Sequence, residues 1–332
     1  MDNTATADAP NLDCLIIGGG PAGLTAATYL MRFHRRILVV DAGSSRARWI
    51  PTSHNCPGFP SGVHGTTLLE RMREQAMGYG TPIVSGCVAR LEKQDEGFVA
   101  TAADGQRWRA RFVILATGVV DRMPALRGLE DAIASSAVRL CAICDAYEAS
   151  DDSIAVYGPI DDAVRHALFL RTFSPRVSAL PLDGSAPDPE LAQQARDAGV
   201  TLCPVPCTMR YEPAGETADA ADGVVVEFED GSTTRFTTLY PVLGSEAQTA
   251  IATALGARCD DNAELIVDAH QQTSVDGLYA AGDLVSALNQ IAVAVGHASI
   301  AATAIHNRLP RNFRERRETQ PPTAPDLPTP AR

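Results

Sequence analysis

A glycine-rich turn at residues 18–23 constrains the fold of this chain more than any other feature of the sequence. The apolar run Leu12–Ile17 precedes this turn, and an alanine-rich stretch with helical periodicity follows it to about Arg32. Such an order predicts a buried strand, a tight turn and a helix. A second apolar run, Ile37–Val40, stops at Asp41 and completes a predicted β-α-β unit.

The glycines of this turn stand where a dinucleotide-binding unit needs them. The first permits the tight turn, the second lets the backbone approach a pyrophosphate, and the third allows close contact of helix and strand. An acidic residue at the end of the second strand accepts hydrogen bonds from ribose hydroxyls. A plain glycine turn is the alternative, and the flanking strand, helix and acid argue against it. The candidate nucleotide ligands are Gly18, Gly20, Pro21, Ala22, Gly23 and Asp41.

The same strand, glycine and helix order recurs later in the chain. Ile154–Tyr157 precedes Gly158, and a helical stretch follows to about Thr172. The dipeptides Asp104-Gly105 and Asp230-Gly231 are hairpin signals in corresponding places. An internal duplication is therefore expected.

The duplication predicts an α/β fold with two Rossmann-like lobes, each a three-layer ββα arrangement. The first lobe is expected to comprise residues 1–121 and 246–310, and the second, inserted lobe residues 122–245. Residues 311–332 form a proline-rich tail that cannot sustain a helix or a sheet interior. We expect this tail to be extended or disordered, although Phe313 would allow it to fold back over the site.

Composition excludes several classes of function. Of the 332 residues, 45% are hydrophobic and 20% charged, and the formal net charge is −12. Nucleic acid and anionic lipid are unlikely partners for such an acidic chain, because both need clustered Lys and Arg. Residues 1–10 lack the features of a secretory leader, and no stretch of about 18 apolar residues offers a membrane span. A cytoplasmic protein is expected.

Of the eight cysteines, only Cys141 and Cys144 have the CxxC spacing of a redox motif. This spacing lets two sulfurs reach disulfide geometry within one turn and permits reversible two-electron chemistry. Half of a zinc site is the alternative, but no second CxxC or nearby Cys-His cluster completes four ligands. No metal is therefore expected.

The motifs GGGPAG, ATG, CAICD and YAAGD, in this order, resemble the low-molecular-weight thioredoxin reductases of the FAD-dependent pyridine nucleotide-disulfide oxidoreductase superfamily. The resemblance extends from Leu12 to about Leu309. It implies bound FAD, a homodimer and a thioredoxin-like protein or small dithiol or disulfide as substrate. It also implies that Cys144 lies against the flavin, that Cys141 exchanges with the substrate, and that Asp145 gives and takes protons.

The resemblance also assigns further flavin contacts. The Gly-Asp pair of the family bonds the phosphoribityl chain, although an aspartate at a helix start is otherwise a plain N-cap. His297 follows these contacts as a candidate proton-handling group, with a structural histidine as the alternative. The flavin contacts that the resemblance implies are Asn55, Ala116, Thr117, Gly118, Gly282, Asp283, Gln290 and Ile291.

The second glycine turn departs from the family pattern for NADPH. It reads Gly158-Pro159-Ile160-Asp161-Asp162-Ala163, so a β-branched residue replaces the middle glycine and two acids open the helix. The position that corresponds to the ribose-binding acid is Pro181, and residues 177–184 contain no basic residue for a 2′-phosphate. The sequence therefore predicts a branch of the family with a degenerate NADPH site.

Three functional hypotheses follow. The first is a flavoenzyme that passes two electrons between FAD and a dithiol or disulfide through Cys141 and Cys144 without NADPH, with ferredoxin, another electron donor or oxygen as the other partner. The second is an ordinary NADPH-dependent thioredoxin reductase with a divergent nucleotide site. The third is a non-catalytic flavin sensor whose disulfide switches conformation or partner choice.

Overall fold

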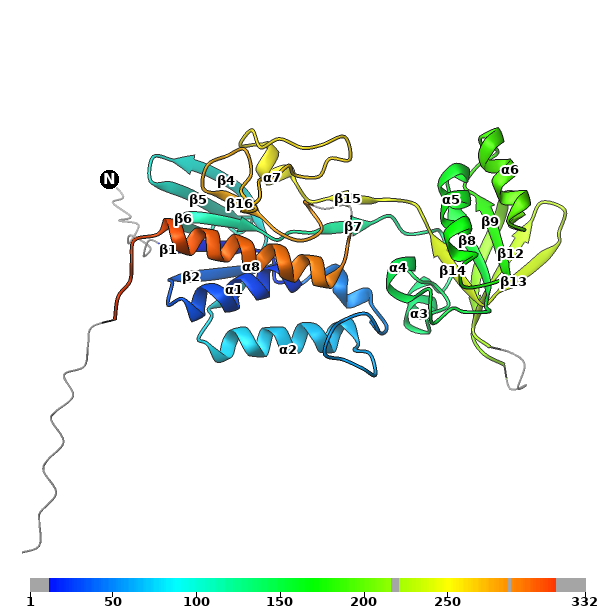
Figure 1. The fold of residues 1–332 in the computed structure, drawn as a ribbon, viewed down its shortest axis with the longest axis horizontal. Helices are drawn as coiled ribbons and strands as arrows, with labels where there is room; N and C mark the ends of the chain where they lie inside the picture. Colours follow the sequence, from blue (N-terminus) through cyan, green and yellow to red (C-terminus); the bar gives the residue numbers. More distant parts are fainter. Residues whose placement is uncertain (1–11, 216–220, 286–287, 315–332) are drawn as a thin grey trace, which may run out of the picture.

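The computed structural model describes residues 12–215, 221–285 and 288–314. Two lobes lie at opposite ends of an elongated molecule (Figure 1). A pair of antiparallel strands, β7 (Val119–Asp121) and β15 (Ser245–Ala247), runs between them. The chain therefore crosses from the first lobe to the second and back along one short ribbon.

A mostly parallel sheet forms the centre of the first lobe. Its strand order is β3-β2-β1-β6-β5-β4, with β16 paired to β6, and the segment β3-β2-β1-β6 is parallel. Strand β6 pairs with β5 through residues 107–110 and with β16 through residues 113–115. The strands are β1 (Leu12–Ile17), β2 (Ile37–Asp41), β3 (Ile83–Ser85), β4 (Val88–Gln94), β5 (Gly97–Ala102), β6 (Arg107–Leu115) and β16 (Leu278–Ala280).

Both faces of this sheet are covered, which explains why its central strands read as continuous apolar runs. Cys14 and Ile16 of β1 pack into one core cluster, whereas Leu15 and Ile17 pack into the other. Alanines of α1 and α8 allow these two helices to lie close together on the first face. The helices of this lobe are α1 (Pro21–Arg32), η1 (Arg46–Trp49), α2 (Gly65–Gly78), α7 (Ala250–Thr253) and α8 (Ile291–Arg308).

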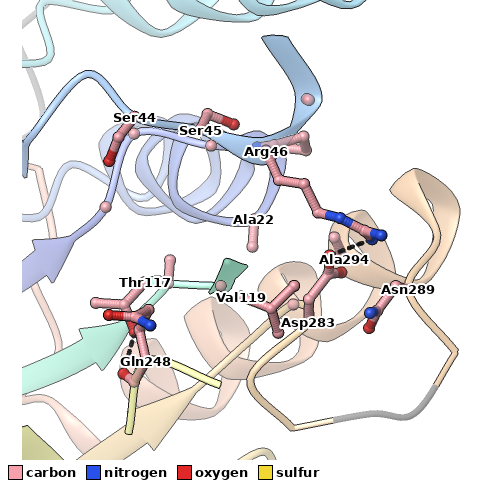
Figure 2. Close-up of a pocket in the computed structure, with 18 of the residues that line it drawn as sticks. Ala22, Ser44, Ser45, Arg46, Thr117, Val119, Gln248, Asp283, Asn289 and Ala294 are labelled. Carbon is pink, nitrogen blue, oxygen red and sulfur yellow. Dashed lines mark hydrogen bonds and ion pairs between the residues drawn. The ribbon is translucent and has the colours of Figure 1, made fainter. Parts of the chain in front are cut away.

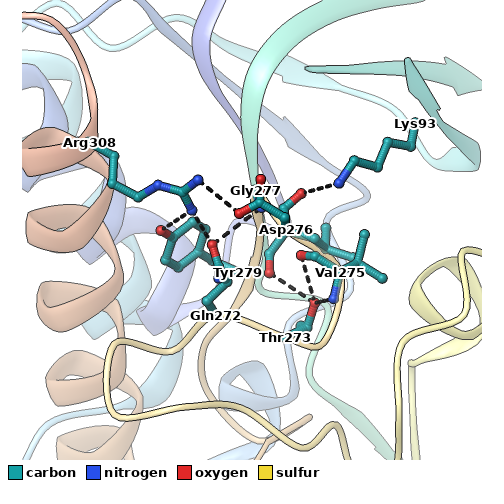
Figure 3. A network of polar contacts seen from close by, with 9 residues as sticks. Lys93, Gln272, Thr273, Val275, Asp276, Gly277, Tyr279 and Arg308 are labelled. Carbon is teal, nitrogen blue, oxygen red and sulfur yellow. Dashed lines mark hydrogen bonds and ion pairs between the residues drawn. The ribbon is translucent and has the colours of Figure 1, made fainter. Parts of the chain in front are cut away.

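Arg308 ties the end of α8 to the turn before β16 (Figure 3). Its guanidinium donates to Asp276 Oδ1 at 2.8 Å and to the Tyr279 hydroxyl at 3.2 Å, and it also contacts Gln272. Lys93 of β4 donates to the Asp276 carbonyl at 2.6 Å. These contacts anchor the far end of the helix whose first residue, Ile291, follows the predicted flavin contact Gln290.

The second lobe repeats the plan with a smaller sheet. Its strand order is β10-β9-β8-β14, and a separate antiparallel sheet β11-β12-β13 packs with it. The strands are β8 (Ser153–Gly158), β9 (Arg176–Pro181), β10 (Thr201–Leu202), β11 (Pro206–Glu212), β12 (Gly223–Phe228), β13 (Thr233–Phe236) and β14 (Thr238–Pro241). The helices are α3 (Leu129–Ala134), α4 (Ala142–Asp145), α5 (Ile160–Leu170) and α6 (Pro189–Asp197).

The predicted fold class is confirmed, because two Rossmann-like α/β sheets are present and the CxxC pair lies on α4. The domain limits at 121, 245 and 310 stay a prediction, and the strand pair β7–β15 lies at the first two of them. Phe313 is 81% exposed and lies beside Arg311, and residues 315–332 of the predicted tail lie outside the described residues. Within the described ranges, no helix combines the length and apolarity that a membrane crossing requires.

Candidate active site

A cavity of about 480 Å³ lies where the first lobe meets α4 of the second. The β1–α1 turn, the end of β2, the segment after β6 and the start of α8 line it, together with Cys141, Cys144 and Asp145. Every residue that the sequence predicts as a cofactor contact, except Gly23, is among its lining residues. The structure therefore brings the predicted binding residues and the dithiol to one cavity.

The first glycine turn leaves no room for side chains. Gly18 has φ +113°, and a Cβ there would lie 2.2 Å from the Ala116 carbonyl oxygen. A Cβ on Gly23 would lie 1.9 Å from the Gly18 carbonyl oxygen. Helix α1 then begins with Gly20 as N-cap, without a side-chain capping bond, and Pro21 in its first turn. Its first backbone N–H groups therefore face the cavity as an anion site.

Asp41 lies at the end of β2 directly beside this turn. Its Oδ1 accepts the backbone N–H of Gly43 at 2.9 Å, and Arg73 of α2 contacts its Oδ2. A Cβ on Gly19 would lie 2.3 Å from Asp41 Oδ2, so any larger residue there would displace the Asp41 carboxylate. The sequence pattern did not mark Gly19, because its neighbour across the turn becomes visible only in the fold.

Arg46 of η1 pairs with two carboxylates, and Figure 2 shows its contact with the one that lines the cavity, Asp283. It binds Asp121 with two contacts, at 2.6 and 2.8 Å, and Asp283 Oδ2 at 3.4 Å. Burial raises the pKa of Asp283, and the charge of Arg46 opposes this shift. Arg46 thus links the predicted flavin contact Asp283 to strand β7 of the lobe connection, and no sequence motif marked it.

Cys141 and Cys144 form a disulfide at the start of α4. The side-chain amide nitrogen of Gln290 donates to Cys144 Sγ at 3.2 Å and to Cys141 Sγ at 3.4 Å. The side-chain oxygen of Gln290, Oε1, accepts a hydrogen bond from Asn55 Nδ2 at 2.8 Å. Two predicted flavin contacts of the first lobe therefore touch, directly or through one step, the redox sulfurs of the second lobe.

Asp145 lies beside the disulfide, where polar side chains partly surround its carboxyl group. It accepts a hydrogen bond from the Tyr240 hydroxyl at 2.9 Å, and Arg139 Nη1 lies 3.6 Å from its Oδ2. Burial raises the pKa of Asp145 to about 6, while Arg139 and Tyr240 lower it and Glu148 raises it. A carboxyl with this pKa exchanges protons near neutral pH, as proton transfer to thiols requires.

The sequence profile of the pyridine nucleotide-disulphide oxidoreductase family matches residues 12–298. The chain belongs to this family.

Curated members of the family cover most of the chain. The thioredoxin reductase of Helicobacter pylori is 26% identical over 309 residues, which are 90% of this chain and 99% of the relative. The thioredoxin reductase of Aquifex aeolicus is 28% identical over 305 residues, which are 90% and 93% of the two chains. The protein is thus an FAD-dependent, thioredoxin reductase-like oxidoreductase.

Solved structures agree with this assignment. The thioredoxin reductase of Streptococcus pyogenes superposes with a TM-score of 0.79 at 27% identity and covers 89% of this chain and 97% of that one. The structure of HlmI gives a TM-score of 0.79 at 27% identity and covers 90% and 92% of the two chains. The similarity extends over both lobes.

The cavity fits the FAD of this family. Asn289 lines it, and its buried Oδ1 has no hydrogen-bond partner among the residues that the structure describes, so it can accept from a bound group. The Thr117 hydroxyl donates to the Gln248 carbonyl at 2.8 Å, and both residues line the cavity together with Asp283 and Asn289 (Figure 2). The residues that would hold FAD are the glycine turn with Asp41 at one end and Asp283, Asn289 and the start of α8 at the other.

His297 lies on α8 and does not line this cavity. Burial lowers its pKa, and its buried Nδ1 has no hydrogen-bond partner among the described residues. The structure therefore does not bring it to the dithiol, and its role in proton transfer stays a prediction. In the described ranges, no three side chains of His, Cys, Asp or Glu converge as a metal site would require.

Proposed function

We propose that this protein moves two electrons between FAD and a dithiol or disulfide substrate through Cys141 and Cys144 without using NADPH. The observation that carries the proposal is the β8–α5 turn of the second lobe, where the family's nucleotide would bind. A thioredoxin-like protein or a small dithiol is the proposed substrate. A homodimer in the cytoplasm, with ferredoxin, another donor or oxygen as the second partner, belongs to the same proposal.

The turn itself supports this reading. Ile160 occupies the place of the middle glycine, and its side chain packs into the core of the second lobe. Strands β8 and β9 pair Gly158 with Pro181, and the Leu182 N–H donates to the Gly158 carbonyl at 2.8 Å. In the first lobe the corresponding register places Asp41 beside Gly18. Pro181 therefore stands where the ribose acid would stand, and its side chain cannot form that hydrogen bond.

The charges around the start of α5 also disfavour the binding of a dinucleotide phosphate. Asp161 and Asp162 lie in its first turn, where a phosphate would need positive charge. The Asp161 carboxylate accepts the backbone N–H of Asp188 at 2.8 Å, so it is held at the start of α6. Arg165, the nearby cation, is paired with Asp162 at 3.2 Å. A dinucleotide phosphate would meet two carboxylates and a neutralised arginine.

When bound, FAD supplies the two-electron carrier that exchanges with the dithiol, and the protein residues direct the sulfur chemistry. A substrate thiolate attacks Cys141 Sγ, the Cys141–Cys144 bond breaks, and Cys144 leaves as a thiolate. The second substrate thiolate attacks the mixed disulfide, which releases oxidised substrate and reduced Cys141. Asp145 holds or accepts the protons that the thiols exchange, because its raised pKa keeps it partly protonated near neutral pH.

Anaerobic titration of the FAD-loaded protein tests the proposal. Dithiothreitol should bleach the flavin, and NADPH or NADH should not do so at a catalytic rate. Variants with Ser at either redox cysteine should lose reduction by dithiothreitol while keeping the bound flavin. Fast bleaching by NADPH would reject the proposal.

The thioredoxin reductases among the relatives favour a second candidate, an NADPH-dependent thioredoxin reductase with an altered nucleotide turn. It predicts NADPH-driven reduction of thioredoxin, which the same titration measures. Turnover with either kind of reductant would in turn exclude a flavin sensor without catalysis.

A further inference from the structure

A chain of three side chains leads from the first lobe to the redox sulfurs. Ser53 Oγ donates to Asn55 Oδ1 at 3.1 Å, Asn55 Nδ2 donates to the side-chain Oε1 of Gln290 at 2.8 Å, and Gln290 Nε2 donates to both sulfurs. In this arrangement each side-chain amide presents its oxygen to the donor before it and its nitrogen to the next acceptor. The amide nitrogen of Gln290 is therefore the end that faces sulfur.

Both ends of this chain are held by backbone structure. Ser53 is 3% exposed and exchanges backbone hydrogen bonds with Val63 at 2.8 and 3.0 Å. Gln290 is the N-cap of α8, and its carbonyl accepts the Ala294 N–H at 3.0 Å. The donor that faces the sulfurs is thus positioned by a buried serine and by an 18-residue helix, which limits the motion of its side chain.

The two redox states of the sulfurs accept this donor unequally. A disulfide sulfur is a weak acceptor, whereas a thiolate carries a full negative charge and forms a charge-assisted hydrogen bond. When a dithiol reduces the pair, the Sγ–Sγ bond breaks, the dithiol closes to its own disulfide, and the sulfurs keep two electrons. The nearest donor to Cys144, at 3.2 Å, then stabilises the thiolate that remains there.

We propose that Gln290 is a catalytic residue that stabilises the Cys144 thiolate, and that Asn55 and Ser53 are positioning residues that keep its amide nitrogen on the sulfur. This inference rests on the proposed dithiol function and adds a residue role to it. In addition to the flavin contacts that the sequence predicts, it assigns to Gln290 a contact with sulfur and to Asn55 the orientation of the Gln290 amide.

The test measures the pKa of the Cys144 thiol in the FAD-loaded protein. In a Cys141→Ser background only one redox thiol remains, and its alkylation by iodoacetamide can be followed against pH by mass spectrometry. Gln290→Ala should raise this pKa by about one unit, so that alkylation near neutral pH slows about tenfold. We expect this lower end of the range for a charged hydrogen bond because Asn55 is exposed to solvent.

Variants at position 55 test whether Asn55 sets the orientation of the Gln290 side-chain amide. Asn55→Asp removes the donor to Gln290, so the amide should turn its oxygen to the sulfur and raise the thiol pKa by more than Asn55→Ala does. The two changes Asn55→Asp and Gln290→Ala should be non-additive in a double-mutant cycle. Gln248→Ala is the matched control, because Gln248 lines the same cavity and its amide bonds the Glu246 carbonyl instead.

The result that overturns the inference is an unchanged Cys144 pKa in Gln290→Ala and Asn55→Asp, with flavin content and melting temperature preserved. Additive effects of these two changes would also overturn it, because they would mean that Asn55 acts by charge alone. The readout does not depend on the electron donor. If NADPH proves to be the reductant, the proposed function fails while the thiol pKa values still decide the role of Gln290.

Discussion

The Tyr240 hydroxyl offers a direct test of how the protein sets the acidity of Asp145. Tyr240 is 2% exposed on β14, and its own pKa is raised far above the ordinary value by burial. It therefore stays protonated at any working pH and donates to Asp145 Oδ1 at 2.9 Å. Tyr240→Phe removes this donor and keeps the ring, so the core should be preserved.

The sign and size of the expected change in the Asp145 pKa follow from the contacts of its carboxyl group. A hydrogen bond to a charged acceptor contributes about 1.5 to 3 kcal/mol, and one pKa unit corresponds to about 1.4 kcal/mol. Arg139 remains 3.6 Å away in the variant and still favours the carboxylate, whereas Glu148 opposes it. We therefore expect the lower end, a rise of about one unit in the Asp145 pKa from its value of about 6.

The assay is single-turnover reduction of the disulfide by dithiothreitol, with the new thiols counted after an acid quench. Protonated Asp145 donates to the leaving Cys144 thiolate, so this contribution is present at low pH and is lost as pH rises through its pKa. At half a pH unit above 6, Asp145 is protonated in about a quarter of wild-type molecules and in about three quarters of variant molecules. The ratio of variant to wild-type rates cancels the ionisation of the reagent.

The pH dependence of the reduction rate should have an inflection at the pKa of Asp145. An inflection that stays in place or moves to lower pH in Tyr240→Phe would refute this reasoning. Asp145→Asn should remove the inflection altogether. Tyr211→Phe is the matched control, because Tyr211 donates to the Asp222 carboxylate at 2.6 Å in the antiparallel sheet of the second lobe. That variant loses a similar phenol–carboxylate bond and should keep the wild-type profile.

Three further outcomes are expected. Arg46→Met leaves two largely buried carboxylates without their cation, so urea denaturation should show a loss of about 2 to 4 kcal/mol, which Arg46→Lys recovers only in part. Gly23→Val forces a side chain onto the Gly18 carbonyl and should yield protein without flavin absorbance, whereas full flavin content would contradict the turn geometry. Under native conditions Ellman's reagent should label the exposed Cys87 and not the buried Cys14, whose pKa is strongly raised by burial, and early loss of the Cys14 thiol would contradict the packing.

Local pattern predicted the elements well because their signals lie within a few residues of one another. The predicted strand Leu12–Ile17 has those bounds in the structure, and the predicted helix ends at Arg32 as expected. The first turn, the CxxC pair and the acid after it also lie at one cavity. Glycine, proline and alternating apolar residues suffice for such predictions.

The contacts that tune the chemistry were not predictable in this way. Tyr240 meets Asp145 across 95 positions, and Gln290 meets Cys144 across 146 positions. No spacing rule relates residues so far apart, because their meeting depends on how β14 and α8 pack in the finished lobes. Arg46 was missed for the same reason, since an arginine at the start of a short helix carries no signal until its two acids are in place.

Under the proposed function, the second lobe keeps a nucleotide-type fold while its glycine turn no longer binds NADPH. Ile160 has become part of the core, and truncating a buried isoleucine costs about 2 to 5 kcal/mol. Asp161 supports the start of α6, and Pro181 ends a strand paired with Gly158. Each residue that departs from the dinucleotide pattern thus has a packing or hydrogen-bonding partner of its own. Under the same proposal, restoring the glycine at position 160 alone would remove core packing without supplying a ribose-binding acid or a basic residue for the phosphate.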